Sequence, residues 1–136
     1  MTAVSATDPA AATRALAPRV RAHLRAVAAR ATPITYQALA QALALAPPRT
    51  IHRVAIALEH LMQEDAANGH PFIAALVVSK ARGGLPAPGF FDAARRLGRF
   101  GGADASASAS AFHAAAFAAA VEFWRSPDGP EADDAA

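Results

Sequence analysis

Residues 33–61 read PITYQALAQALALAPPRTIHRVAIALEHL, and this stretch decides the predicted fold. Its large apolar residues recur at intervals of three and four, which is typical of two amphipathic helices, and a proline pair separates them. These positions are Leu39 and Leu43 in the first helix and Ile51, Val54, Leu58 and Leu61 in the second. Thr35 and Thr50 precede the two runs, and we expect them to be the N-caps. A very short strand is expected at 34–36.

Another helix is predicted before this pair. It carries one apolar stripe at Leu16, Val20, Leu24, Val27 and Ala31. Pro18 then lies either in the first turn of that helix or at a kink in a longer one. After the pair, Asn68-Gly69 predicts a left-handed helix stop.

The second half of the chain begins with an apolar run at 72–79, which predicts a buried strand. Residues 80–89 hold three glycines and two prolines and are expected to form a loop. Helices are predicted at about 90–98 and 110–124, on either side of a Gly/Ala/Ser linker at 101–110.

This order of elements predicts a mainly α protein with a small β element, a winged-helix-like helix bundle with extra C-terminal helices. Its 136 residues match one domain, and an apolar content of 54% is too high for a disordered chain. We expect a flexible N-terminus at 1–12, a single domain at 13–125 that includes the linker, and a disordered acidic tail at 126–136.

Composition and motifs argue against metal binding, cofactor binding and catalysis. The chain has no cysteine, so it offers no thiolate ligand or nucleophile. No histidine pair has the spacing of a metal clamp, and no P-loop or G-x-S-x-G motif is present. We therefore expect no metal, no cofactor and no catalytic residues. The sequence shows no signal peptide and no membrane span, which predicts a cytoplasmic protein without a membrane partner.

The charge is unevenly distributed, which favours an anionic partner. From Thr13 to Leu58 there are seven arginines and no acidic residue. If the second helix of the pair enters a DNA major groove, its N-terminal end presents guanidinium and imidazole groups to the duplex, and the glycine-rich loop forms a basic wing. The predicted nucleic-acid-binding residues are Arg49, Thr50, His52 and Arg53 on the helix and Lys80 and Arg82 on the wing, with double-stranded DNA as the partner.

A protein-interaction module without nucleic-acid binding or catalysis is the alternative. Winged helices also serve this role, and fold alone does not decide between them. The aromatic residues beside the loop would then form a pocket or partner surface, made by Tyr36, Phe90, Phe91 and Trp124. In the competing interpretation Phe90 and Phe91 fill the core, and Tyr36 packs under the wing with its hydroxyl at the surface.

Two resemblances accompany these patterns. Ile34-Thr-Tyr-Gln-Ala-Leu-Ala40 resembles the I-T-Y-x-x-L-A that opens the winged-helix domain of the DNA alkyltransferases and alkyltransferase-like proteins. Their Pro-Cys-His-Arg or Pro-Trp-His-Arg motif is absent, because His70-Pro-Phe-Ile73 stands in that region, so the resemblance implies layout without alkyl transfer. Leu76-Val-Val-Ser-Lys80 and Gly84-Leu-Pro-Ala-Pro-Gly-Phe-Phe91 resemble a family of small bacterial winged-helix-like proteins that implies no particular activity.

Overall fold

The structure, a computed structural model, describes residues 9–101 and 107–125, and it is mainly α-helical with a small β element, as predicted. The elements are α2 (Pro9–Arg30), β1 (Ile34–Thr35), α3 (Tyr36–Ala42), α4 (Thr50–Ala67), the 3-10 helix η1 (Ile73–Leu76), β2 (Val77–Val78), the 3-10 helix η2 (Lys80–Arg82), α5 (Pro88–Arg96) and α6 (Ala107–Trp124). The predicted acidic tail, residues 1–8 and part of the linker, 102–106, lie outside the described residues.

Helix α2 begins earlier than expected, inside the segment 1–12 that we predicted to be flexible. Because it starts at Pro9, Pro18 lies in its interior and not in its first turn. The predicted stripe holds over its first four positions, since Leu16, Val20, Leu24 and Val27 are all buried. Ala31 follows the helix with a φ of 55° and is exposed.

One of the two predicted N-caps is confirmed. The hydroxyl of Thr35 accepts a hydrogen bond of 3.1 Å from the N–H of Ala38 and starts α3. At α4 the prediction is wrong, because Thr50 is already helical and Arg49 is the N-cap residue, with a φ of 58° and no side-chain cap. The predicted stop is confirmed, since Asn68 is the C-cap of α4 and Gly69 has a φ of 69°.

The predicted strand at 72–79 is mostly wrong. The run folds into η1, and only Val77 and Val78 are extended. They pair in parallel with β1, with Ile34 opposite Val77 and Thr35 opposite Val78. The described residues form no β-hairpin at the expected wing, where η2 stands instead. A wholly buried run carries no alternation of exposed and buried residues, so its sequence does not distinguish a strand from a tight helix.

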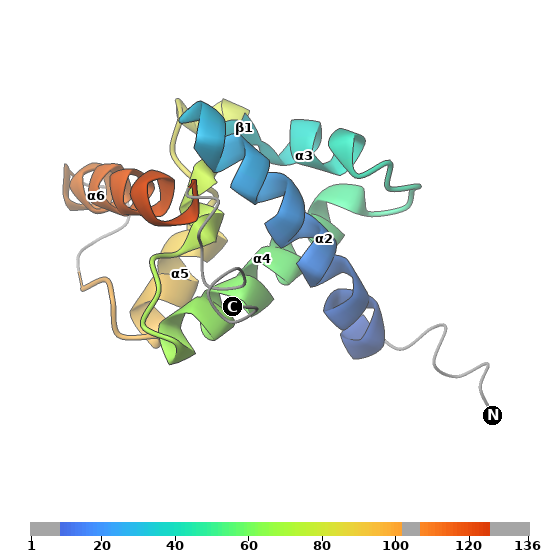
Figure 1. Cartoon of the computed structure of the whole chain (residues 1–136), viewed down its shortest axis with the longest axis horizontal. Helices are drawn as coiled ribbons and strands as arrows, with labels where there is room; N and C mark the ends of the chain where they lie inside the picture. Colours follow the sequence, from blue (N-terminus) through green and yellow to red (C-terminus); the bar gives the residue numbers. More distant parts are fainter. Residues whose placement is uncertain (1–8, 102–106, 126–136) are drawn as a thin grey trace, which may run out of the picture.

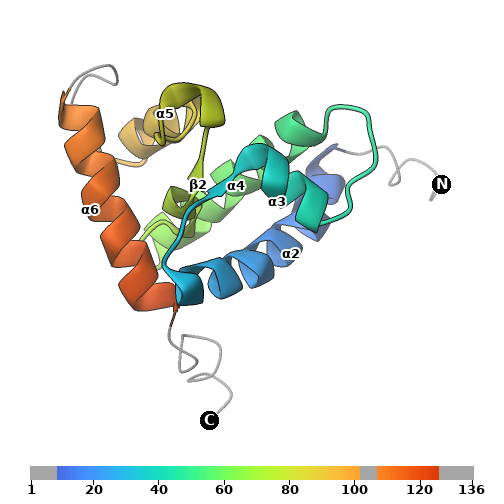
Figure 2. The ribbon, with the colours of Figure 1, turned by 90° about the horizontal axis from the view of Figure 1, so that it is seen from above.

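Helix α2 packs across α4 at the centre of the molecule (Figure 1). Helix α6 stands at one end, where it contacts α2 and η1 (Figure 2). The segment from β2 to α5 lies on the opposite side of α4 from α2, and η1 passes between these layers. This arrangement leaves the N-terminal halves of α2 and α4 away from α6.

An aromatic cluster joins α5 to α6 inside the core. Phe91 is 0% exposed, and its ring centroid lies 5.3 Å from that of Phe90 and 5.4 Å from that of Phe100. Phe100 in turn stacks on Phe112 of α6 at 4.7 Å. These contacts confirm that Phe90 and Phe91 fill the core.

Asp65 ties α4 to the segment that follows it. The carboxylate is 1% exposed, and its Oδ2 accepts a 3.0 Å hydrogen bond from the N–H of Ile73. Its Oδ1 lies 2.9 Å from Nη1 of Arg21, an ion pair that is not aligned as a hydrogen bond. Burial raises the pKa of Asp65, while the Ile73 amide and the Arg21 guanidinium lower it in part. Removal of this carboxylate would leave both partners unsatisfied.

His113 ties α6 to η1 in a similar way. Its ring is buried, and Nε2 donates a 2.9 Å hydrogen bond to the carbonyl of Ala75. Burial lowers the pKa of His113, and the bond to the carbonyl opposes this shift in part. The folded protein therefore favours the neutral imidazole.

This lowered pKa predicts that stability falls in mild acid. The unfolded chain binds a proton at His113 near pH 6.5, whereas the folded chain binds it only at lower pH, so the unfolded state gains protons first and the free energy of unfolding drops below about pH 6.5. Urea unfolding at about pH 7.5 and about pH 5.5 measures the drop. It should shrink in His113→Gln, which keeps a donor but does not titrate; an equal drop in the variant would contradict the assignment to His113.

No helix in the described ranges is both long and apolar enough to cross a membrane.

Candidate binding groove

Three of the predicted nucleic-acid-binding residues lie together, and three do not. Arg49, His52 and Arg53 line one groove between the N-terminal halves of α2 and α4. Thr50 starts α4 but does not line this groove, and neither Lys80 nor Arg82 of η2 does. Arg82 donates instead to the carbonyl of Pro86 at 3.2 Å. The predicted wing residues therefore do not line this groove together with the residues of the predicted helix end.

This groove, which we call the apolar groove, has a volume of about 510 Å³. Most of its surface is apolar, and basic residues are among those that border it. Its lining is Ala12, Thr13, Ala15, Leu16 and Arg19 from α2, Leu45 from the α3–α4 connection, and Arg49, His52, Arg53 and Ile56 from the start of α4. No carboxylate is among these residues.

Two of the bordering guanidinium groups are held in place by backbone carbonyls. Nη2 of Arg19 donates to the carbonyl of Leu43 at 2.7 Å. Nη1 of Arg53 donates to the carbonyls of Ala46 at 2.8 Å and Pro48 at 3.3 Å. A guanidinium has five N–H donors, so these bonds position the cations and leave donors for an incoming carboxylate.

The two large apolar side chains that stand exposed among the described residues both belong to the start of α4. Ile51 is 43% exposed and Ile56 is 39% exposed. Ile56 lines the apolar groove, whereas Ile51 does not. An exposed isoleucine beside an apolar groove offers a partner more surface to bury.

The aromatic residues predicted as a partner surface are not accessible as one. Phe90, Phe91 and Trp124 are all buried. The indole N–H of Trp124 donates to the carbonyl of Pro71 at 2.9 Å, and its ring lies against His70 and Phe123. These side chains hold the fold together and expose no apolar patch.

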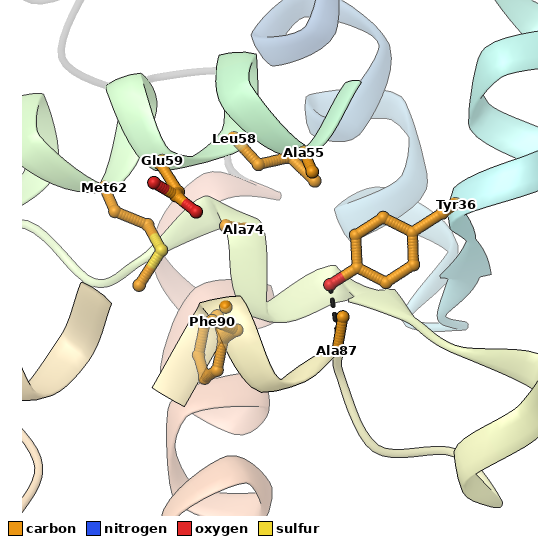
Figure 3. A pocket seen from close by; sticks show the side chains of 9 residues that line it. Tyr36, Ala55, Leu58, Glu59, Met62, Ala74, Ala87 and Phe90 are labelled. Atoms are coloured by element: carbon orange, nitrogen blue, oxygen red, sulfur yellow. Dashed lines mark hydrogen bonds between the residues drawn. The ribbon is translucent and has the colours of Figure 1, made fainter. Parts of the chain in front are cut away.

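Tyr36 and Phe90 instead border a small cavity of about 30 Å³ between α4 and α5. The hydroxyl of Tyr36 accepts a 3.0 Å hydrogen bond from the N–H of Ala87, and Glu59 and Met62 reach the cavity from α4 (Figure 3). Burial raises the pKa of Tyr36. The hydroxyl is therefore bonded to the segment that precedes α5. A cavity of this size holds about one water molecule, so it is too small for a substrate.

Metal binding gains no support from the chain as described. Among residues 9–101 and 107–125, no group of three His, Asp or Glu side chains lies close enough to hold an ion.

Sequence reasoning missed Arg19, Leu45 and Ile56 as part of this site. One signal was present, because Ile56 lies outside the apolar stripe of its own helix and had no predicted packing partner. Arg19 could not be distinguished from the other arginines of α2, since its role depends on the path of the α3–α4 connection.

Comparison with models of protein families, with curated proteins and with solved structures gives no match, so the resemblance to winged-helix and alkyltransferase-like proteins stays a prediction.

Proposed function

We propose that this protein is an interaction module whose apolar groove binds a segment of another protein that combines large apolar side chains with carboxylates. One observation carries the proposal: a groove of about 510 Å³ with an apolar surface is bordered by three arginines and, among the residues that the structure describes, by no carboxylate.

The two kinds of contact have separate roles. Burial of a leucine-sized or phenylalanine-sized side chain against Leu16, Leu45 and Ile56 would supply most of the affinity, at about 1.5–3 kcal/mol for each side chain fully removed from water. Carboxylates facing Arg19 and Arg53 would select the partner and orient it, because charge-assisted hydrogen bonds to guanidinium groups are directional. An amphipathic helix in a groove presents its apolar groups from the buried face and its carboxylates from the flanks of that face.

The distribution of basic groups favours this proposal over duplex DNA. The guanidinium of Arg21 on α2 is paired with Glu64 at 3.0 Å and with Asp65 at 2.9 Å. Arg82 is turned toward Pro86. Phosphate contacts alone would not require an apolar surface between the remaining cations, whereas a protein segment would use it.

A matched pair of isoleucine variants tests the groove. The probe is a synthetic amphipathic peptide of roughly 15 residues, with leucine and phenylalanine on one face and glutamate along both flanks of that face. Ile56→Glu should weaken binding at least about tenfold, because it removes apolar burial and repels the ligand carboxylates. Ile51→Glu should leave binding unchanged, since that equally exposed side chain lies outside the groove. Isothermal calorimetry measures both affinities.

Three control ligands show which chemical features of the ligand the groove requires. A peptide with lysine in place of glutamate and a peptide with alanine in place of leucine and phenylalanine should both bind less tightly than the probe. The third ligand is a short DNA duplex at about 50 mM salt, where phosphate attraction is strong. Duplex binding that is lost in Arg49→Ala and Arg53→Ala but kept in Ile56→Glu would favour the nucleic-acid alternative. No binding of the acidic peptide would contradict the proposal.

A further inference from the structure

Another groove lies between α6 and the segment that joins α4 to η1. Its volume is about 410 Å³, and we call it the α6 groove. Most of its surface is apolar, and it shares no lining residue with the apolar groove. Its lining includes Phe72 before η1, Arg99 from the segment that follows α5, and Phe112, Ala115 and Ala119 from α6.

Helix α6 forms a low and even wall of this groove. Three of the four α6 residues on the lining are alanines, so no branched or charged side chain of this helix projects into the space. From Phe112 to Ala119 the helix rises about 10 Å. An extended alkyl chain of medium length spans this rise and can lie along the wall.

The backbone on the opposite wall is already hydrogen bonded. The N–H groups of Gly69 and His70 donate to carbonyls of α4. The carbonyls of His70 and Pro71 accept bonds from two side chains. A peptide in this groove would therefore find few partners for its own N–H and C=O groups, and burial of such groups without partners is costly. An alkyl chain carries no such groups, so this wall favours it.

Arg99 places a positive charge on the lining. Its Nη1 donates to the carbonyl of His70 at 2.7 Å and its Nη2 to the carbonyl of Asp65 at 3.4 Å, while its Cζ lies 4.4 Å from the centroid of the Phe72 ring. Within residues 9–101 and 107–125, no carboxylate lies within ion-pair distance of this guanidinium. A guanidinium has five N–H donors, so donors remain for the carboxylate of a ligand.

We infer that the α6 groove binds a free medium-chain fatty acid, with the alkyl chain along α6 between Phe112 and Ala119 and the carboxylate on Arg99. Each methylene that leaves water tightens binding by up to about fourfold. The charge-assisted bond to Arg99 fixes which end of the ligand lies at the guanidinium. This site is separate from the apolar groove, so the two proposals can fail independently.

A titration with sodium decanoate, kept below its critical micelle concentration, tests the site through amide chemical shifts. We expect shifts at 69–72, at Arg99 and at 112–119, with the amides at 12–19 and 49–56 little changed. Octanoate, which is shorter by two methylenes, should bind about tenfold more weakly. Decanol, which has the same chain without the charge, should also bind at least about tenfold more weakly than decanoate.

Two exposed alanines of α6 provide a matched pair of variants. Ala119→Phe should fill the groove and weaken decanoate at least about tenfold, whereas Ala118→Phe should leave binding unchanged, because Ala118 does not line the groove. Arg99→Gln is a second and independent test. It should remove the preference for decanoate over decanol, and this ratio is insensitive to a general loosening of the groove, which would weaken both ligands.

Several results would overturn the inference. They are shifts centred on 12–19 and 49–56, equal binding of decanoate and decanol to the natural protein, equal effects of the two alanine variants, and no binding of decanoate. Binding to vesicles of an anionic phospholipid without binding of free decanoate would also overturn it, because it would make a membrane surface the partner.

Discussion

Replacement of Asp65 with alanine is expected to lower the free energy of unfolding by about 3–5 kcal/mol, the largest effect of any single polar substitution that we predict. The variant would leave the Ile73 N–H without its acceptor and the Arg21 guanidinium, only 12% exposed, without its buried counter-ion. Loss of a buried partner costs more than the contact itself contributes, because the remaining group stays desolvated. Urea unfolding followed by circular dichroism measures the change.

Glu64→Ala is the matched control for that substitution. Glu64 neighbours Asp65 and contacts the same guanidinium at 3.0 Å, but its side chain is 47% exposed. Water and salt screen such a contact, so its removal should cost no more than about 1 kcal/mol. Asp65→Leu combined with Arg21→Met should be less destabilising than Asp65→Leu alone. The double variant removes both charges, so no buried charge is left without its partner. Equal losses for Asp65→Ala and Glu64→Ala would contradict the structural role of Asp65.

Phe91→Ala is expected to cost about 3–5 kcal/mol, because it empties the centre of the aromatic cluster. The ring is 0% exposed and contacts Phe90 and Phe100, so a cavity remains where these neighbours cannot close it. The loss should be concentrated in α5 and α6, which this cluster joins. Thermal unfolding gives the total effect, and amide hydrogen exchange shows which helices open first.

The same variant separates folding from binding. Because Phe91 lies outside the apolar groove, the fraction of Phe91→Ala that remains folded at low temperature should bind the acidic peptide as the natural protein does. Phe117→Ala, at a partly exposed position on α6, should cost clearly less stability. A selective loss of peptide binding in folded Phe91→Ala would instead support the predicted role of Phe91 in the partner surface.

Much of the fold could be predicted from the sequence, because its helices follow local signals. The stripe of α2, the Thr35 cap and the Asn68-Gly69 stop each depend on residues close together in the chain. The segment 72–79 could not be predicted in this way. Its backbone is fixed by Asp65, eight residues before Ile73, through a hydrogen bond that hydrophobic periodicity does not reveal.

The candidate site was predictable only in part, for a similar reason. The exposed cations at the start of α4 could be found, because a short turn and a following helix identify that end. Their surroundings could not, since the apolar surface between them comes from α2 and from Leu45, and only the packing of α2 across α4 brings these together. Phe90 and Trp124 have the composition of an interface, but their burial shows them to be core.

The fluorescence of Trp124 can report whether α6 is packed against the rest of the fold. It is the single tryptophan of the chain, and its indole is buried where α6 meets α2, with its N–H bonded to Pro71. Indole emits at shorter wavelength in an apolar environment than in water, so emission above 300 nm would follow the detachment of α6 without any label. A red shift that precedes the loss of helical circular dichroism would identify α6 as a unit that opens before the rest of the fold.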